Sequence, residues 1–296
     1  MGSIPRIDYD SYSDIKLRKK NSIRTVKSTV SIEGNGLSLE QVTDVLNGIR
    51  VIAPKNELLE VKNAISAYEQ MDTFDAFNID HLLLAHKIMM TGLTQDAGNF
   101  RNSGVGIVKE NRYVHVAPPP LEVSGLISNL FAYLMESSDS LLIKSCVFHY
   151  EFEFIHPFCD GNGRVGRLWQ QLILSKMHPV FKIICVEELL EKNQEEYYGA
   201  LRTSDDKGSS ETFVEFMLKM IKISLKNSPG LMPAENNFRT RLLYAKNSIN
   251  NFKRADYMRL FPNISTATAS RDLINGVKFG ILKKNNSKNQ TMYSFI

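Results

Sequence analysis

The sequence has few cysteines, and the three that it contains, Cys146, Cys159 and Cys185, are neither paired nor clustered. This spacing excludes a disulfide framework and the common cysteine sets that bind zinc. It fits reduced thiols in a cytoplasm. The chain also lacks an apolar run long enough to span a bilayer, and the N-terminus shows no signal-peptide pattern. We therefore expect a cytoplasmic protein that does not enter a membrane.

A strong charge excess is absent as well. The 36 basic and 32 acidic residues give a formal net charge of +4, which does not by itself indicate nucleic-acid binding. Internal repeats and low-complexity tracts are missing. With 43% hydrophobic and 23% charged residues over 296 positions, the composition predicts a globular protein longer than one typical domain.

The residues from His156 to Arg167 concentrate side chains that bind phosphate and transfer protons. They read His-Pro-Phe-Cys-Asp-Gly-Asn-Gly-Arg-Val-Gly-Arg and lie between two helical patterns, 141–155 and 164–177. Glycines at the start of the second helix allow successive backbone N–H groups to converge on an anion. The two arginines are three residues apart, so they share one helix face and present forked, permanently charged donors.

Two further side chains complete this chemistry. Asp160 offers the oxygen ligand that Mg²⁺ prefers, because this ion usually binds one or two carboxylates together with substrate phosphates. His156 is mostly neutral at pH 7 and can accept a proton from an attacking hydroxyl. Each residue alone has an ordinary structural interpretation, such as a turn or a solvated helix face. Their order and spacing together indicate a site for a nucleotide polyphosphate.

This segment resembles the signature of the Fic family of nucleotidyl transferases, His-x-Phe-x-(Asp/Glu)-Gly-Asn-Gly-Arg-x-x-Arg, at every fixed position. The resemblance implies a compact bundle of helices. It also implies transfer of AMP from ATP to a Ser, Thr or Tyr hydroxyl of a target protein, with release of pyrophosphate.

The resemblance assigns a role to each residue of the motif. His156 corresponds to the general base, Phe158 to a buried anchor of the loop, and Asp160 to the Mg²⁺ ligand. The residues that correspond to the nucleotide-binding positions are Asp160, Gly161, Asn162, Gly163, Arg164 and Arg167. Of these, Asn162 and the glycine amides are expected at the α-phosphate, and the two arginines at the β- and γ-phosphates.

A hairpin is predicted upstream of the motif. Gly98-Asn99-Phe100-Arg101 resembles the family's Gly-x-Phe-Arg element, and residues 105–116 have a β-rich pattern that ends before three prolines. In the family this hairpin is the flap over the active site, where a target segment adds to an exposed strand edge. We expect Tyr113, Val114 and His115 at this edge. The alternative is an ordinary surface hairpin.

Downstream, residues 195–201 resemble the family's tyrosine-containing helix beside the adenine. The candidates for the base pocket are Tyr197, Tyr198, Leu201 and Asp205. Asp205 stands where some relatives carry an asparagine, and its carboxylate can accept a hydrogen bond from the exocyclic amine of adenine.

A second motif lies near the N-terminus. Residues 29–34, Thr-Val-Ser-Ile-Glu-Gly, match (Ser/Thr)-x-x-x-Glu-(Gly/Asn), the inhibitory motif of Fic proteins. The β-branched run fits a helix or a strand. In a helix, Gly34 ends the element and Glu33 places a negative charge at the negative end of the dipole. The resemblance implies that Glu33 binds Arg167 and competes with the γ-phosphate.

The chain after a proline- and glycine-containing linker at 227–233 predicts a second domain. Helical patterns at 238–249, 254–260 and 265–279 precede two strands at 280–284 and 291–295. Three helices and a hairpin resemble a winged helix-turn-helix, which accompanies many Fic proteins. Arg271, Lys283, Lys284 and Lys288 would suit DNA phosphates, whereas the shortage of base-reading residues favours protein docking.

We therefore predict an all-α Fic core with a small β-hairpin flap and a C-terminal winged-helix domain of the α+β class. The expected divisions are an N-terminal segment with the inhibitory helix (1–45), the catalytic core (46–228) and the winged-helix domain (229–296).

The expected activity is Mg²⁺-dependent AMP transfer from ATP to a protein hydroxyl, held low by Glu33. A DNA-binding regulator, or a Fic relative that removes AMP or uses another donor, remains an alternative. Gly163 argues against the kinase-like variant, in which a lysine replaces this glycine. The expected partners are ATP and a target protein on the flap, while self-modification and homo-oligomerisation stay open.

Overall fold

The computed structural model describes residues 12–109, 112–227, 238–246, 249–261, 264–287 and 290–296. Contacts divide the chain into two compact units. The larger unit is Ile15–Leu225, and the smaller one contains Lys226–Ile296. No helix within these ranges is both long and apolar enough to cross a membrane.

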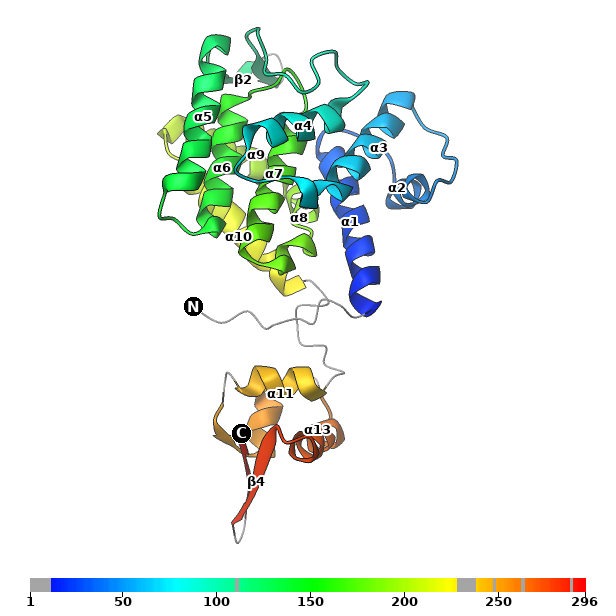
Figure 1. Cartoon of the computed structure of the whole chain (residues 1–296), viewed down its shortest axis with the longest axis vertical. Coiled ribbons are helices and arrows are strands. Elements are labelled where there is room, and N and C mark those ends of the chain that lie inside the picture. The colour runs from blue at the N-terminus through cyan, green and yellow to red at the C-terminus, as the bar shows by residue number, and fades with distance from the viewer. Residues whose placement is uncertain (1–11, 110–111, 228–237, 247–248, 262–263, 288–289) are drawn as a thin grey trace. The chain divides into compact units, whose positions relative to one another are not determined.

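The larger unit is a bundle of helices (Figure 1). In chain order its helices are α1 (Tyr12–Ile32), α2 (Leu39–Leu46), α3 (Lys55–Glu69), α4 (Ile79–Met90), α5 (Pro120–Glu136), α6 (Leu141–Ile155), α7 (Asn162–Met177), α8 (Glu187–Lys192), α9 (Gln194–Lys207) and α10 (Glu211–Asn227). Short 3-10 turns occur at Met71–Thr73 and Pro179–Lys182. The prediction of a mostly helical fold is confirmed.

Helix α7 forms the centre of this bundle. It packs along α6, and α4 also contacts it. Nearly every side chain of α7 from Arg164 to Ser175 is buried, whatever face of the helix it occupies. A helix that is buried on all sides must lie inside a protein core. Because α7 begins at Asn162, within the His156–Arg167 motif, this core fixes the position of the motif.

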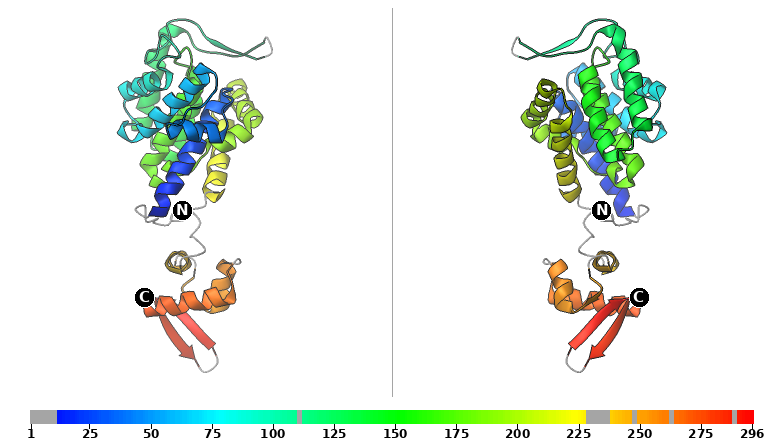
Figure 2. Two further views of the ribbon diagram at one scale, coloured as in Figure 1. Left: turned by 90° about the vertical axis from the view of Figure 1, so that its right-hand side faces the viewer. Right: turned by 90° about the vertical axis from the view of Figure 1, so that its left-hand side faces the viewer.

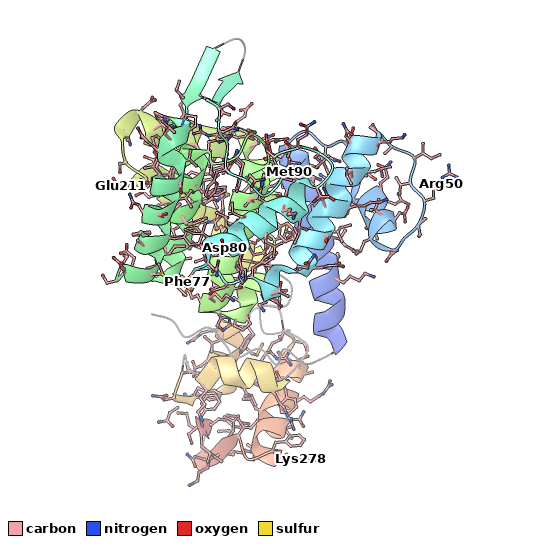
Figure 3. The ribbon with its side chains drawn as sticks, turned by 45° about the horizontal axis from the view of Figure 1, so that its top comes forward. Arg50, Phe77, Asp80, Met90, Glu211 and Lys278 are labelled. Atoms are coloured by element: carbon pink, nitrogen blue, oxygen red, sulfur yellow. The ribbon has the colours of Figure 1, made fainter. Side chains whose placement is uncertain are left out.

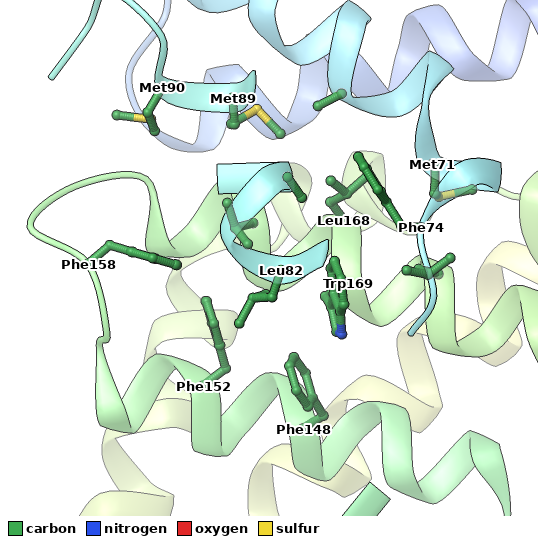
Figure 4. Close-up of a cluster of buried hydrophobic side chains, with 14 of the residues drawn as sticks. Met71, Phe74, Leu82, Met89, Met90, Phe148, Phe152, Phe158, Leu168 and Trp169 are labelled. Atoms are coloured by element: carbon green, nitrogen blue, oxygen red, sulfur yellow. The ribbon is translucent and has the colours of Figure 1, made fainter. Parts of the chain in front are cut away.

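An aromatic cluster ties the motif loop to the same core (Figure 4). Trp169 of α7 and Phe148 and Phe152 of α6 are fully buried, and the indole N–H of Trp169 donates to the Ala76 carbonyl at 3.1 Å. Phe158 reaches into this cluster from the loop between α6 and α7 and is also fully buried. Burial of one such ring stabilises the fold by roughly 1.5–3 kcal/mol.

Helix α1 resolves the ambiguity in the N-terminal motif, because its β-branched residues form a helix and not a strand. Val26 and Val30 are buried against the core, and the amide of Asn21 donates to the Ile183 carbonyl at 2.6 Å. Ion pairs join Arg24 to Glu188 and Lys27 to Glu191. The helix is therefore fastened to the segment around α8 by both apolar and charged contacts.

The predicted hairpin is present between α4 and α5. Strands β1 (Gly106–Lys109) and β2 (Arg112–Val116) pair antiparallel, with Gly106 opposite Val116 and an irregularity between Ile107 and Val108. It extends from one end of the larger unit in both views of Figure 2. Such an extended pair leaves strand edges available for a further strand.

In its described residues, the smaller unit combines three helices with a three-stranded antiparallel sheet. Its elements are α11 (Phe238–Lys246), β3 (Asn251–Phe252), α12 (Arg254–Leu260), α13 (Thr266–Lys278), β4 (Leu282–Ser287) and β5 (Gln290–Phe295), and the strand order is β3-β5-β4. The predicted helices and hairpin are thus confirmed; residues 247 and 248, near the end of the first predicted helix, lie outside the described residues. Strand β3 was not predicted, because two residues carry too little periodicity to be recognised.

A buried ion pair lies in the core of this unit. The Arg241 guanidinium donates to both carboxylate oxygens of Asp272, at 2.5 and 2.7 Å, and the Tyr257 hydroxyl donates to the same carboxylate at 3.1 Å. Burial together with the Asp272 charge raises the pKa of Tyr257, which keeps it a donor. The pair joins α11 to α13, so it fixes the packing of two helices.

We expect Asp272→Asn to destabilise the smaller unit by about 3–5 kcal/mol, because Arg241 would keep a buried charge without its counterion. Unfolding in urea, followed by circular dichroism, measures this loss. Fluorescence of Trp169, the single tryptophan of the chain, reports on the larger unit and should be unchanged. The matched control is Arg259→Ala, which removes an exposed pair with Asp256 and should cost less than about 1 kcal/mol. Equal losses in the two variants would contradict the prediction.

Candidate active site

The loop between α6 and α7 begins with a strained backbone. His156 ends α6 in the left-handed conformation, with φ of 49°, and it is the one non-glycine residue with positive φ within the described ranges. This conformation costs a residue with a Cβ roughly 1–2 kcal/mol. Gly161 adopts φ of 86° immediately before α7. The two residues turn the chain between the two helices. Only Gly161, which has no Cβ, adopts a positive φ without strain.

Arg101 holds this strained residue in place. Its Nε donates to the His156 carbonyl at 2.7 Å, and its terminal nitrogens donate to the carbonyls of Ile155, Pro118 and Ser103. The side chain is buried, and burial lowers its pKa, but these acceptors satisfy the guanidinium. The Gly-x-Phe-Arg pattern by itself predicts no structural role for Arg101. In the structure it links the motif to the end of the hairpin.

The imidazole of His156 has a defined tautomer. Its Nδ1 lies 3.2 Å from the Glu153 carbonyl, and a carbonyl can only accept, so Nδ1 carries the proton. The lone pair is then on Nε2. A neutral imidazole of this form can accept a proton through Nε2, as a general base must.

Asn162 has a different position from the one expected. Its side-chain amide faces back into the loop, where it accepts from the Phe158 N–H at 2.9 Å and donates to the Phe158 carbonyl at 2.8 Å. The side chain is buried. Asn162 therefore closes the loop on itself, and the groups left to face an anion at the start of α7 are backbone amides.

Asp160 is the carboxylate at the surface of the loop. Its side chain is 63% exposed, and its Oδ1 accepts from the Gly161 N–H at 2.6 Å and from Arg164 at 3.0 Å. Within the described ranges, no group of three or more His, Cys, Asp or Glu side chains gathers as a metal site. A single exposed carboxylate fits an ion such as Mg²⁺, which takes most of its other ligands from phosphates and water.

The first arginine of the motif, Arg164, is buried and held by two carboxylates. Its Nη1 donates to Glu60 of α3 at 3.3 Å and its Nη2 to Asp160. The Nε has no hydrogen-bond partner among the described residues. Glu60 also accepts from Asn35 at 2.8 Å, in the turn after α1, so Arg164 is connected to the N-terminal segment.

The second arginine, Arg167, contacts the inhibitory motif directly. Its Nη2 donates to Glu33 Oε1 at 2.6 Å and to the Thr29 carbonyl at 3.0 Å, and its Nε donates to the Thr29 hydroxyl at 2.9 Å. Burial disfavours the charge of Arg167, but the adjacent Glu33 carboxylate, together with Tyr197 and Glu153, outweighs this effect and raises the pKa of Arg167. The two residues that the sequence pairs by resemblance are thus in contact.

Glu33 also lies against the start of α7. A Cβ added at Gly163 would collide with the Glu33 carboxylate and approach Arg167 Nη1 to 2.9 Å. Gly34, with φ of 95°, ends the α-helical run and lets the chain turn away. The carboxylate therefore occupies the space beside the first turn of α7, where the sequence predicts that an anion binds.

A second carboxylate near Arg167 was not recognised in the sequence. Glu187, at the start of α8, is buried beside Thr25 of α1 and Tyr68 of α3, whose hydroxyls lie 3.5 Å from its two oxygens. Burial raises the pKa of Glu187 to about 7, although the Arg167 charge acts in the opposite direction. Nothing in its local sequence separates Glu187 from the exposed acidic residues around it.

The expected adenine-binding residues lie on α9 and have different surroundings. Tyr197 is buried, and its hydroxyl contacts His149 Nε2 at 3.0 Å, so it faces the core. Tyr198 is 37% exposed and Leu201 is partly exposed. Asp205 accepts from the Tyr150 hydroxyl at 3.0 Å. The structure therefore offers Tyr198 and Leu201, but not Tyr197, to a base at the surface.

Two expected sets of side chains fall outside the described part of the structure. The backbone of Tyr113, Val114 and His115 forms β2, but their side chains are not described. Lys288, expected near the wing, also lies outside the described residues.

For the buried histidines, burial lowers the pKa of His86 to about 4 and that of His149 to about 3, so both rings are neutral near pH 7.

Comparison with known proteins agrees with this geometry. The profile of the Fic/DOC family matches residues 76–174. A crystal structure of a Fic family protein from Desulfovibrio desulfuricans has 34% sequence identity and a TM-score of 0.71, and the match covers 97% of this chain and 91% of that one. The chain belongs to the Fic family.

More distant Fic relatives match over part of their length. Protein adenylyltransferase fic-1 of Caenorhabditis elegans is 28% identical over 70% of this chain and 41% of its own length. A probable protein adenylyltransferase of Aquifex aeolicus is 30% identical over 62% of this chain and 53% of its own. A solved Fic-1 fragment from C. elegans has the same fold, with a TM-score of 0.58 at 24% identity. The chain thus spans about half the length, or less, of these two curated relatives.

The raised pKa of Glu187 predicts a pH dependence of stability for this Fic protein. Between its ordinary value of 4.5 and about 7 the folded state holds a proton that the unfolded state has released, so stability falls as the pH rises. The loss attributable to this carboxyl is about 3 kcal/mol. Glu187→Gln should flatten this part of the curve, and Glu195→Gln, an exposed control, should not. Urea unfolding followed by Trp169 fluorescence at pH 5 and pH 8 measures both, and parallel curves for wild type and Glu187→Gln would contradict the assignment.

Proposed function

We propose that this Fic protein transfers AMP from ATP to a Ser, Thr or Tyr hydroxyl of a target protein, and that Glu33 holds this activity low. The names of its relatives as protein adenylyltransferases support the reaction. The observation that carries the proposal is the contact of Glu33 with Arg167 beside the first turn of α7. A carboxylate there stands in for the terminal phosphate of a nucleotide, because both are anions that suit a guanidinium and a helix N-terminus.

Inhibition follows from competition for one cation. Arg167 is buried, so it needs an anionic partner, and Glu33 provides one at 2.6 Å. A triphosphate whose γ-phosphate binds Arg167 must displace this carboxylate. With Glu33 in place, the nucleotide can bind only in a shifted position in which the α-phosphate is not aligned with the attacking hydroxyl.

The chemical step uses the loop and His156. Nε2 of His156 accepts the proton of the target hydroxyl, while Nδ1–H stays bonded to the Glu153 carbonyl and fixes the ring. The oxygen then forms a bond to the α-phosphorus, and the bond from that phosphorus to the pyrophosphate oxygen breaks. The amides at the start of α7 stabilise the charge on the α-phosphate, and Arg164 and Arg167 stabilise the leaving pyrophosphate.

Asp160 is the residue that would hold Mg²⁺. Its exposed carboxylate, fixed by Gly161 and Arg164, suits an ion whose other ligands are phosphate oxygens and water. When bound, the ion would neutralise charge on the phosphates. The hairpin β1–β2 would receive the target segment by strand addition, which positions a hydroxyl without requiring one target sequence.

The proposal predicts opposite effects for two substitutions. Glu33→Gly should increase AMP transfer at least tenfold, because Arg167 becomes available to the nucleotide, whereas His156→Ala in that background should lower it by about 10²–10⁴. Purified protein is incubated with cell lysate and with ATP labelled at the α- or the γ-phosphorus, and label on protein is counted. Label from the α-position alone is expected.

Three outcomes would contradict the proposal in different ways. An unchanged rate in Glu33→Gly would remove the inhibition. Label from the γ-position would indicate phosphate transfer, and release of AMP from modified protein would indicate the reverse reaction. Glu40→Gly, in the exposed first turn of α2, is the control for loss of an acidic residue and should leave the rate unchanged.

We also infer that the chain has an inhibitory segment (1–45), a catalytic core (46–228) and a C-terminal winged-helix domain (229–296). The order of α11, α12, α13 and the β4–β5 hairpin supports the last assignment. On α13, which corresponds to the recognition helix, Ile274 is 64% exposed and Phe279, directly after the helix, is 51% exposed. These apolar side chains suit a protein partner better than base edges in a DNA groove.

This assignment predicts that the full chain does not bind DNA specifically. A labelled duplex should not shift at about 0.1 M salt, and any retention at lower salt should disappear as salt rises. The measurement is a gel shift with the full chain and with a double variant, Arg271→Ala and Lys283→Ala, as the control. Retention at moderate salt that the double variant abolishes would favour the DNA-binding alternative.

A further inference from the structure

His86 lies outside the motif but contacts its centre. It is in α4, is 1% exposed, and each of its ring nitrogens lies 2.9 Å from a backbone group of a different loop. Nδ1 faces the Gly98 N–H, and Nε2 faces the Asp160 carbonyl. Because an N–H can only donate and a carbonyl can only accept, one neutral tautomer satisfies both contacts, with the proton on Nε2.

Stacking fixes the plane of this ring. The imidazole lies parallel to the Phe158 ring, with centroids 3.6 Å apart and planes 3° apart, and the Phe100 ring lies 5.6 Å from that of Phe158. Phe158 is itself joined to Asn162 by two hydrogen bonds. The ends of the loop are thus held by Asn162, and its middle is held by His86.

The hydrogen bond from His86 to the Asp160 carbonyl also orients the amide of the next residue. The carbonyl of Asp160 and the N–H of Gly161 belong to one planar peptide and point in opposite directions. When His86 holds the carbonyl toward α4, the Gly161 N–H must face away from α4, toward the Asp160 carboxylate that accepts it at 2.6 Å. The orientation of this one peptide therefore determines where the Gly161 N–H lies and, through their hydrogen bond, where the Asp160 carboxylate lies.

A glycine peptide needs such a restraint. Gly161 has φ of 86°, which only glycine adopts easily, and a Cβ there would collide with Met90, one turn after His86 on α4. Figures 3 and 4 show Met90 at the end of this helix, and Figure 4 shows the loop beside it. A side chain that would restrict the backbone is therefore excluded, and the same lack of a Cβ lets the peptide rotate.

We propose that His86 is a positioning residue that prevents rotation of the Asp160–Gly161 peptide, so that the Gly161 amide keeps its bond to the Asp160 carboxylate and this carboxylate stays in place at the nucleotide loop. This inference rests on the proposed function for its effect on the reaction. The effect on the loop itself depends only on the hydrogen bonds. The sequence predicts only a structural role for His86, because a lone histidine in an apolar helix carries no ligand spacing.

Two substitutions separate the two contacts of the ring. In His86→Gln the amide nitrogen reaches as far as Nε2 and still donates to Asp160, while the bond from Gly98 is lost. In His86→Asn the amide oxygen takes the place of Nδ1 and still accepts from Gly98, while the bond to Asp160 is lost. Both variants lose the stacked ring and carry the same uncharged amide, so they differ in the contact that they keep and in one methylene group.

The variants are made in the Glu33→Gly protein, where transfer is measurable. We expect His86→Asn to lower kcat by about 10- to 100-fold, the usual cost of removing a group that orients a ligand, with KM for ATP changed less than about threefold. His86→Gln should stay within about threefold of its parent. Both variants should lose similar thermal stability. If kcat falls equally in the two variants, in proportion to their loss of stability, then His86 has only a structural role.

A second measurement does not depend on catalysis. Hydrogen exchange of the Gly161 amide, resolved by nuclear magnetic resonance without nucleotide, should be at least about tenfold faster in His86→Asn than in His86→Gln. If the parent transfers no AMP, the proposed function fails and Gly161 exchange alone decides the role of His86; equal rates overturn it. If His86→Asn does not fold, nuclear magnetic resonance of the wild-type protein is used to determine which nitrogen of the His86 imidazole carries the proton. A proton on Nδ1 in place of Nε2 overturns the inference.

Discussion

The buried guanidinium of Arg167 requires an anionic partner, and this requirement determines how the N-terminal segment packs on α7. Arg167 lies in the most enclosed helix of the larger unit, next to the first turn of α7, and it keeps its charge because Glu33 is beside it. Removing one partner of a buried pair costs about 3–5 kcal/mol, far more than an exposed pair contributes. The anion can therefore be exchanged for another anion, but it cannot simply be lost.

The scaffold places the Glu33 carboxylate where, under the proposed function, the γ-phosphate would bind, beside Arg167. Helix α1 is followed directly by Glu33 and is fastened to the segment around α8 by Asn21 and by two ion pairs. Glu33 thus lies at the negative end of the helix dipole, where its charge is unfavourable without a cation. Arg167 satisfies that charge, and Glu33 satisfies Arg167. Each residue is costly alone, so the contact stabilises both, and under the proposed function the γ-phosphate is the anion that replaces Glu33.

Much of the fold and of the candidate site could be predicted from residue types. The residues that the sequence did not reveal were missed for one common reason. The helical core, the hairpin and the C-terminal helices follow from periodicity and from glycine and proline positions. The resemblance to the Fic motifs predicted the contact between Glu33 and Arg167. Glu187 and His86 were missed, because their importance lies in burial and in partners more than 70 residues away, which no local pattern encodes.

The position of Asn162 illustrates how far spacing alone can be taken. The sequence places it between two glycines where an anion is expected, but its side chain folds back to close the loop at Phe158. The glycines allow the backbone several conformations, so other groups must hold it in one of them. Asn162, His86 and Arg101 supply that restraint from three directions, all through hydrogen bonds to main-chain groups. The backbone of the loop, which the proposed function assigns to nucleotide binding, is therefore held in one conformation by side chains that bond to its peptides.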